Sequence, residues 1–598
     1  MDKLSLGTRW DLSKIYSTED AFFEEYDQAR KQIDAFSRHE KTMCESAENL
    51  YEAVTDICEI ERKIDKLWCY ASLHFSLNTG SSAYQSLTGK VRSLAAKADE
   101  ASWFFTPSVL KLSEKTLSRF FQELPALSRY RRLIDKTLRL RKHMLSDECE
   151  AFFSRLDDCF GTHGTVRSIF CNSDLRHGKT VGEDGKLVEL TDANYITFMQ
   201  SSNRRVRERA FRTLYKSYGQ FQNTFATLYD AAVRERTTLS RVRGHKSSLH
   251  ASTFRDEVTP DIYNALIRSV HKGLTALYDY YALKREVLGV KRLHMYDLYA
   301  PLVGALDRKY PYEEAVSELL KTVEIYGEEY YNTLKAGVTQ QGWVDVYPAR
   351  GKRSGAFSSG TPDTEPYILL NYTETFDDVS TLVHEAGHSM HSYFSRKYNE
   401  AHESGYTIFV AEVASTVNEL LLTHRKLRES ESDEEKLYIL NHLMESYKGT
   451  LFRQTMFAEF EKKMHELVEG GEVLNAELIS KTYRRLVLRY FGKDVACDKE
   501  INLEWSRIPH FYSSFYVYKY ATCISAASAI VKRIQNEGDA YIKKYIEFLK
   551  CGDRLSPLES LRVAEIDMTD ASVVDAAIET FKDTVEEFRA IYKKTVAG

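Results

Sequence analysis

The residues best suited to chemistry lie in one short stretch, in which His384, Glu385 and His388 form the pattern H-E-x-x-H. Two histidines four residues apart on a helix project from the same face, one turn above the other. Their imidazoles can therefore share one Zn²⁺ ion at bond lengths of about 2.0–2.1 Å. The intervening glutamate can reach a water on that ion and take its proton. The pattern indicates a hydrolytic zinc site, provided that the stretch is helical.

Two residues upstream predict where this helix begins. Thr375 and Asp378 have the spacing of a capping box, in which the threonine hydroxyl and the acid satisfy free backbone amides. Apolar residues then recur at helical spacing, at Val379, Leu382, Val383, Ala386, Met390, Tyr393 and Phe394. At about 100° per residue, His384, His388 and His391 lie on roughly the opposite side. We expect one face of the helix in a core and the imidazoles facing a cleft.

A catalytic zinc ion usually has three protein ligands and one open position, so a third ligand must be found. The acids and histidines that follow the motif are candidates, namely His391, Glu400, His402, Glu403, Glu412 and Glu419. His391 lies about 10.5 Å along the helix from His384, too far for both imidazoles and His388 to converge easily on one ion. We interpret His391 as a substrate contact, as a residue that orients a ligand, or as an ordinary polar histidine.

A second predicted helix, over about 406–421, supplies a better third ligand. It is strongly apolar, and Glu412 stands in it among small and aliphatic neighbours. Because a buried acid is costly unless it is paired or bound to a metal, we expect Glu412 to be the ligand. Glu419 lies two turns further along the same face and is either the alternative ligand or a carboxylate that orients one.

Composition restricts the class of protein. With 598 residues the chain is too long for one core, so two or more lobes are expected. A formal net charge of -5 does not favour a nucleic-acid partner. Only 10 prolines and 28 glycines interrupt the chain, which favours a mostly α fold. The nine cysteines include no C-x-x-C pair, which predicts free thiols rather than disulfides or a cysteine-zinc site.

The chain shows no sign of a membrane association. It contains no run of 18 apolar residues, and its first residues lack the apolar core of a signal peptide. We therefore expect a cytoplasmic protein without a membrane partner. The most apolar internal stretch, Ala521–Val531, is rich in small residues and is interpreted as a buried helix.

The rest of the chain predicts long helices and little else. The first part reads as amphipathic helices at Glu19–Phe36, Ala47–Leu77, Ala83–Ala101 and Lys115–Leu124. An Asp184-Gly185 turn between short strand-like runs predicts a hairpin, and Thr191 can cap the helix after it. We place a domain boundary near this hairpin, with an N-terminal helical lobe at 1–185 and a catalytic region at 186–598.

A small sheet is predicted just before the motif helix. The β-rich runs 343–348 and 367–372 flank a Gly/Ser loop at 351–360, which lacks the residue order of a phosphate-binding loop. A peptide could add to this sheet as an extra strand through main-chain hydrogen bonds. Plain structural packing is the alternative interpretation.

Several of these motifs together resemble a known family. The runs 384–391 and 409–415 look like the M3 family of zinc metallopeptidases, and most of all like its oligoendopeptidase F branch. The runs 10–16 and 510–522 and the loop at 351–359 are similar to the same branch. The resemblance extends over nearly the whole chain.

The resemblance implies a mostly α, two-lobed fold with a deep substrate channel, a small sheet beside the motif helix and one Zn²⁺ per chain. Members of the family cleave short peptides and exclude folded proteins. By matching positions, it implies that His384, His388 and Glu412 are the zinc ligands and that Glu385 is the general base.

The resemblance also assigns a second group of residues. The run from His510 to Tyr520 is similar to a His/Tyr stretch that holds substrate and the developing oxyanion. His510 and Tyr518 match that stretch best, whereas Tyr516 matches less closely and is assigned to substrate binding. Without the resemblance, an aromatic run of this kind would be interpreted as core.

The predicted function is that of a zinc-dependent endopeptidase that hydrolyses internal bonds of short oligopeptides. A zinc carboxypeptidase of related fold is one alternative, which would need a cationic pocket for a terminal carboxylate. A non-catalytic peptide-binding protein is another, against which the intact motif residues argue. The sequence predicts neither the cleavage preference nor the oligomeric state.

Overall fold

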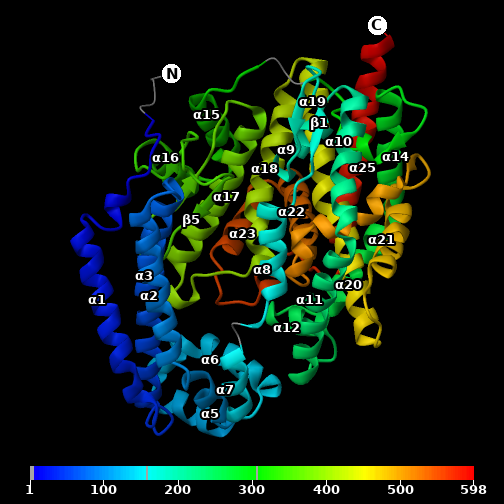
Figure 1. Ribbon diagram of the computed structural model, residues 1–598. Helices are drawn as coiled ribbons and strands as arrows, with labels where there is room; N and C mark the ends of the chain where they lie inside the picture. Colours follow the sequence, from blue (N-terminus) through cyan, green and yellow to red (C-terminus); the bar gives the residue numbers. More distant parts are fainter. Residues whose placement is uncertain (1–5, 157–158, 305–307, 598) are drawn as a thin grey trace. The chain divides into compact units, whose positions relative to one another are not determined.

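The computed structural model describes residues 6–156, 159–304 and 308–597 (Figure 1). These residues form mostly helices, together with three small sheets of two, two and three strands. The predicted mostly α class is confirmed. Within the described ranges, no helix is both long enough and apolar enough to cross a bilayer.

The chain divides into two compact units that interleave along the sequence. Unit 1 comprises residues 1–147, 308–422 and 530–565, and unit 2 comprises residues 148–307, 423–529 and 566–598. Each unit is therefore assembled from three separate stretches of chain. The predicted division at residue 185 follows chain order instead, and it stays a prediction.

Unit 1 is built mainly from amphipathic helices. They are α1 (Glu19–Phe36), α2 (Ala47–Leu77), α3 (Ser82–Ala101), α4 (Phe105–Lys111), α5 (Glu114–Glu123), α6 (Arg131–Arg139), α15 (Tyr312–Val323), α16 (Glu328–Thr339), α17 (Phe376–Tyr398), α23 (Asp539–Leu549) and α24 (Pro557–Val563). Each of α1 to α3 begins at a serine or threonine whose hydroxyl accepts a backbone amide hydrogen bond, and each buries one apolar face. These helices confirm the predicted N-terminal pattern.

A three-stranded sheet lies beside α17 in unit 1 (Figure 1). Its order is β4 (Val344–Asp345), β6 (Tyr367–Leu369) and β5 (Phe357–Ser359), with β4 parallel and β5 antiparallel to β6. The two predicted strands are present, and β5 is an additional edge strand formed within the predicted Gly/Ser loop. The hydroxyl groups of Ser358 and Ser389 lie 2.8 Å apart and join β5 to α17.

The two helices that carry the motif residues pack closely. The predicted capping box begins α17, because Thr375 and Asp378 satisfy each other's backbone amides. A side chain at Gly387 would lie 2.6 Å from the Cα atom of Ser415 in α18 (Ile408–Glu429). Only glycine allows the two backbones to approach this closely. The close approach brings side chains of both helices to one place.

Unit 2 is also largely helical. Its helices are α8 (Thr162–Ile169), α9 (Asp192–Met199), α10 (Arg204–Gln220), α11 (Gln222–Val242), α12 (Ser248–Arg255), α13 (Pro260–Lys272), α14 (Leu274–Val287), α19 (Asp433–Tyr447), α20 (Arg453–Glu469), α21 (Ala476–Phe491) and α25 (Ala571–Ala597), and most of α7 (Asp147–Leu156) belongs to it. The helices α18 and α22 (Tyr518–Glu537) each begin in one unit and end in the other. The predicted buried helix at 521–531 lies within α22.

Four short strands complete unit 2. The predicted hairpin consists of β1 (Lys179–Val181) and β2 (Leu187–Glu189), which pair antiparallel, and Thr191 caps α9 as expected. Two residues each form β3 (Leu293–His294) and β7 (Val495–Ala496), which pair in parallel although about 200 residues separate them.

Candidate metal centre and peptidase residues

The donor atoms of His384, His388 and Glu412 converge in unit 1. The Nε2 atoms of the two histidines are 3.1 Å apart, and each lies 3.3 Å from Oε2 of Glu412. One turn of α17 separates the histidines. Glu412 lies in α18, three residues before Ser415, at which α18 closely approaches Gly387 of α17. The three side chains remain 18–29% exposed, so a small ligand can reach them.

This arrangement fits a zinc ion. In a tetrahedral site with bonds of about 2.0–2.1 Å, neighbouring ligand atoms are about 3.3–3.4 Å apart. The observed separations of 3.1 and 3.3 Å are close to that value. Two imidazole nitrogens and one carboxylate oxygen also leave a fourth corner open, as in hydrolytic zinc sites. Within the described ranges, no other group of three His, Cys, Asp or Glu residues brings its ligand atoms within 4.8 Å of one another.

Glu419 fixes the orientation of the first histidine. Its Oε1 atom lies 2.5 Å from Nδ1 of His384, so the opposite ring nitrogen points to the donor group. Burial alone would lower the pKa of His384, but the carboxylates of Glu419 and Glu412 raise it well above its ordinary value. Burial would raise the pKa of Glu412, and hydrogen bonds from the two histidines instead hold it well below its usual range. The two carboxylates thus stabilise a positive charge on His384.

Glu385 lies next to the donor group in the chain but is not part of it. Its side chain is 6% exposed, and its Oε2 atom is buried without a hydrogen-bond partner among the described residues. Burial raises the pKa of this carboxyl group, although the neighbouring histidines oppose the rise. A carboxylate with a raised pKa and a free oxygen can accept and return a proton.

His391 does not face a cleft, contrary to the prediction. Its side chain is 1% exposed, and its ring stacks on Tyr406 at 3.9 Å between centroids. Burial, and then the charge of His388, lower its pKa to about 3. The neighbouring rings of Tyr406 and Phe548 cover the imidazole, which argues against a contact with substrate and leaves the other two interpretations, a residue that orients a ligand or an ordinary polar histidine.

The second predicted group of residues lies in unit 2. The rings of His510, Tyr516 and Tyr520 form a cluster, with centroid separations of 5.4 to 6.2 Å. All three side chains are partly exposed. Burial, and then the charge of Arg167, lower the pKa of His510, so its imidazole is neutral at pH 7. Tyr520 was not among the predicted residues, although it belongs to the same aromatic run.

Tyr518, in contrast, faces the core of unit 2. It is 0% exposed, and its hydroxyl group lies 3.5 Å from Oδ2 of Asp256, to which Lys519 also donates at 2.7 Å. Its ring packs against Tyr263 at 4.9 Å. This burial corrects the prediction that the Tyr518 hydroxyl contacts substrate, because the side chain anchors its segment instead.

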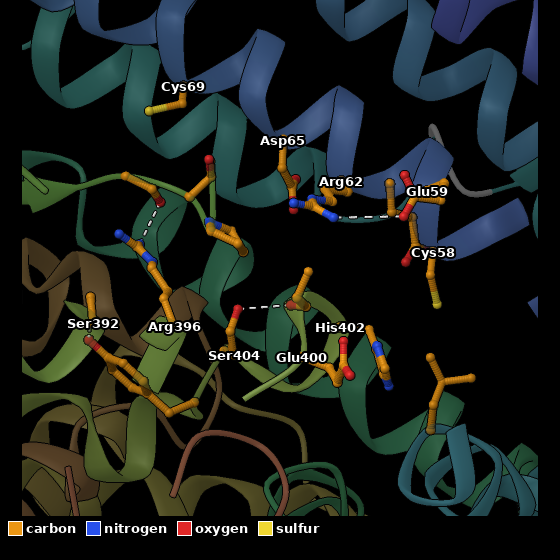
Figure 2. Close-up of a pocket in the computed structure, with 18 of the residues that line it drawn as sticks. Cys58, Glu59, Arg62, Asp65, Cys69, Ser392, Arg396, Glu400, His402 and Ser404 are labelled. Atoms are coloured by element: carbon orange, nitrogen blue, oxygen red, sulfur yellow. Dashed lines mark hydrogen bonds and ion pairs between the residues drawn. The ribbon is translucent and has the colours of Figure 1, made fainter. Parts of the chain in front are cut away.

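A cavity of about 590 Å³ lies beside the C-terminal half of α17 in unit 1 (Figure 2). Ser392, one helical turn after His388, lines it together with Arg396. Arg62 and Asp65 of α2 line the opposite wall. The cavity thus has charged groups of both signs and begins one turn along α17 from the donor group. Its volume is sufficient for peptide side chains.

Two protein-family models match the chain. A model of peptidase family M3 matches residues 197–580, and an oligopeptidase F model matches residues 109–177. The first match covers more than half of the chain and includes all of the donor residues.

Individual relatives cover nearly the whole chain. Oligopeptidase PepF of Bacillus subtilis is 39% identical over 585 residues, which are 98% of this chain and 87% of that protein. The crystal structure of oligoendopeptidase-F from Enterococcus faecium has a TM-score of 0.77 at 33% identity, and the match covers 96% of this chain and 99% of that one. A crystal structure from Chlamydophila abortus reaches a TM-score of 0.89 at 33% identity, with 98% of each chain covered. This chain therefore belongs to peptidase family M3, and its relatives are oligopeptidase F proteins.

Proposed function

We propose that this protein is a zinc-dependent endopeptidase that hydrolyses internal bonds of short peptides. The observation that carries the proposal is the convergence of His384, His388 and Glu412 at the spacing of zinc ligands, beside the unpartnered carboxylate oxygen of Glu385. Membership of a metallopeptidase family supports it. We propose one zinc ion per chain.

The metal and the protein have separate tasks in this proposal. Zinc held by the three donors would polarise the scissile carbonyl and acidify a water. Glu419 keeps His384 in the required orientation through its Nδ1 atom. Glu385 takes a proton from the attacking water and returns it to the leaving nitrogen. The burial of Glu385 limits the access of bulk water to that proton.

We extend the proposal to the aromatic segment of unit 2. His510 is assigned the role that the family resemblance implies, which is to donate a hydrogen bond to the carbonyl oxygen as its negative charge develops. Tyr516 and Tyr520 have partly exposed side chains beside His510 and replace Tyr518 as the phenols that contact substrate. Short peptides are the proposed substrates, bound with side chains in the cavity beside α17.

One digestion experiment tests this function. A peptide of about ten residues, blocked at both ends, is incubated with zinc-loaded protein, with chelator-treated protein, and with treated protein given back one equivalent of zinc. We expect internal cleavage in the first and third samples only, mapped by mass spectrometry. Cleavage that survives full removal of zinc would reject the zinc dependence.

The blocked ends distinguish the alternatives. A carboxypeptidase needs a free terminal carboxylate, so it would cleave only the unblocked version of the same peptide. A non-catalytic binding protein would retain zinc and bind the peptide without cleaving either version. Either of these results would contradict the endopeptidase assignment.

A further inference from the structure

The segment that presents His510, Tyr516 and Tyr520 is not a regular element. A short 3-10 helix covers Pro509–Tyr512, and α22 begins only at Tyr518. Between them, the backbone of Phe515 has a φ of 58°, in the left-handed region that non-glycine residues rarely adopt. A conformation of this kind persists only where surrounding contacts hold it.

One buried acid supplies such a contact. Glu461 of α20 is 1% exposed, and its Oε1 atom accepts a hydrogen bond of 2.7 Å from the backbone amide of Phe515. The Phe515 ring, itself 0% exposed, packs against His465 one turn further along α20 and against Tyr263. The segment is therefore held at its most unusual residue by α20.

Glu461 forms no ion pair with any described residue, although its side chain is buried. An ionised carboxylate in this position would be costly, because it would be buried without a partner of opposite charge. Burial raises its pKa well above the usual range, against the opposing effect of the Phe515 amide. The carboxyl group acts here as the hydrogen-bond acceptor of the Phe515 amide.

We propose that Glu461 is a positioning residue, which holds the Phe515 amide and thereby fixes the orientation of His510, Tyr516 and Tyr520. Buried and accessible side chains are interspersed along the segment. Phe511, Phe515, Val517 and Tyr518 are buried, whereas His510, Tyr516 and Tyr520 remain accessible. Release of the Phe515 amide would let the backbone leave its left-handed conformation and turn the accessible side chains away. The catalytic consequence rests on the proposed function, but the anchoring itself does not.

Hydrogen exchange tests the anchoring without any assay of activity. In the wild-type protein, the Phe515 amide is expected to exchange much more slowly than the neighbouring Ser514 amide, which donates no hydrogen bond to any described residue. Residue-resolved exchange by mass spectrometry measures both. Equal exchange rates at these two amides would overturn the proposal.

Two substitutions separate the hydrogen bond from simple packing. Glu461→Gln keeps an acceptor oxygen of the same reach, whereas Glu461→Leu fills a similar volume without an acceptor. We expect E461Q to keep Phe515 protection and a kcat within about threefold of wild type. We expect E461L to lose the protection and about tenfold or more in kcat, the equivalent of one hydrogen bond, with unchanged zinc content.

A control and a second variant keep the test decisive. Phe581→Leu loosens the packing of unit 2 around Tyr280, Tyr447 and Phe452, away from the segment, so it should lower Tm and leave kcat unchanged. If E461L does not fold, Glu461→Asp withdraws the carboxyl group by one methylene and should lower kcat and protection together. An unchanged kcat in E461L or E461D, or an equal loss in E461Q, would overturn the proposal.

The exchange data also distinguish a failure of the proposed function from a failure of the proposed anchoring by Glu461. If zinc-loaded wild-type protein cleaves no peptide, the proposed function is wrong. The exchange rates of the Phe515 amide in wild type and E461L would still decide whether Glu461 anchors the segment.

Discussion

Glu385 has the surroundings of a proton carrier rather than of a metal ligand. Its carboxyl group is buried next to the two histidines in the chain, and one oxygen has no partner among the described residues. Glu385→Gln preserves shape and removes the ability to accept a proton. We expect this variant to bind zinc as wild type does and to lose about 10²–10⁴-fold in kcat.

Metal analysis together with steady-state kinetics checks this expectation. Full turnover in a zinc-loaded E385Q protein would reject Glu385 as the base. Loss of zinc in the same variant would instead indicate that Glu385 supports the metal site.

His510 and Tyr518 lie in one segment but have opposite surroundings. His510 is partly exposed beside Tyr516, whereas Tyr518 is buried against Asp256. We expect His510→Ala to lose about 10²–10³-fold in kcat with its zinc retained, as for other donors to a developing oxyanion. Tyr518→Phe removes a buried hydroxyl group and should change kcat little.

The same assay on both variants measures the difference. A large loss of kcat in Y518F with unchanged Tm would restore Tyr518 as a substrate contact. An unchanged kcat in H510A would remove His510 from the mechanism.

The sequence predicted these residues unequally, for a physical reason. His384 and His388 could be predicted because one helical turn fixes their relative direction. Glu412 could be predicted because an isolated acid in an apolar helix needs a partner. The direction of Tyr518 depends on the backbone of Phe515, whose φ of 58° no periodic pattern encodes. The burial of His391 depends on Tyr406 and Phe548, which helix periodicity does not place.

At the scale of elements, the metal site depends on how closely α17 and α18 approach. A Cβ atom at Gly387 would lie 2.6 Å from Cα and 2.8 Å from the backbone nitrogen of Ser415. Because these are backbone atoms, the helices themselves would have to move apart. That movement would carry Glu412 away from the two histidines.

We therefore predict that Gly387→Ala weakens zinc binding by about tenfold or more, although alanine favours the helix itself. Competition with a fluorescent zinc chelator measures the affinity. Gly89→Ala in α3 is the matched control, because a Cβ atom there meets nothing within 4 Å. The control should bind zinc as wild type does. An unchanged affinity in G387A would show that the close approach does not position the ligands.

Most elements could be predicted from local signals. Caps and apolar periodicity predicted α1, α2 and the start of α17 at the observed residues. The edge strand β5 was missed, because glycine and serine residues surround it and its pairing partner lies about ten residues away. Strand pairs such as β3 and β7 depend on contacts that are remote in sequence.

At the scale of the whole molecule, the core of unit 1 combines separate stretches of the chain. The N-terminal helices share their core with Tyr367, and the indole of Trp10 donates a hydrogen bond of 2.8 Å to the carbonyl of Ile368. Arg62 of α2 binds Asp363 through two hydrogen bonds of 2.6 and 2.7 Å. A fragment of residues 1–185 would lack all three partners.

We predict that this fragment does not fold cooperatively, because it leaves apolar surface of α1 to α3 uncovered. Circular dichroism in the near ultraviolet and a thermal melt provide the measurement. Retained helix with a broad melt and no near-ultraviolet signal is the expected result. A sharp, reversible melt would show that residues 1–185 form an independent domain.

The account depends above all on three side chains that converge on one zinc ion. X-ray absorption at the zinc edge of the loaded protein tests this most directly. We expect one zinc per chain, with two imidazole nitrogens and oxygen ligands at about 2.0–2.1 Å, and loss of that signal in His388→Ala and Glu412→Ala. Sulfur in the coordination sphere, or an unchanged spectrum in either variant, would contradict the account.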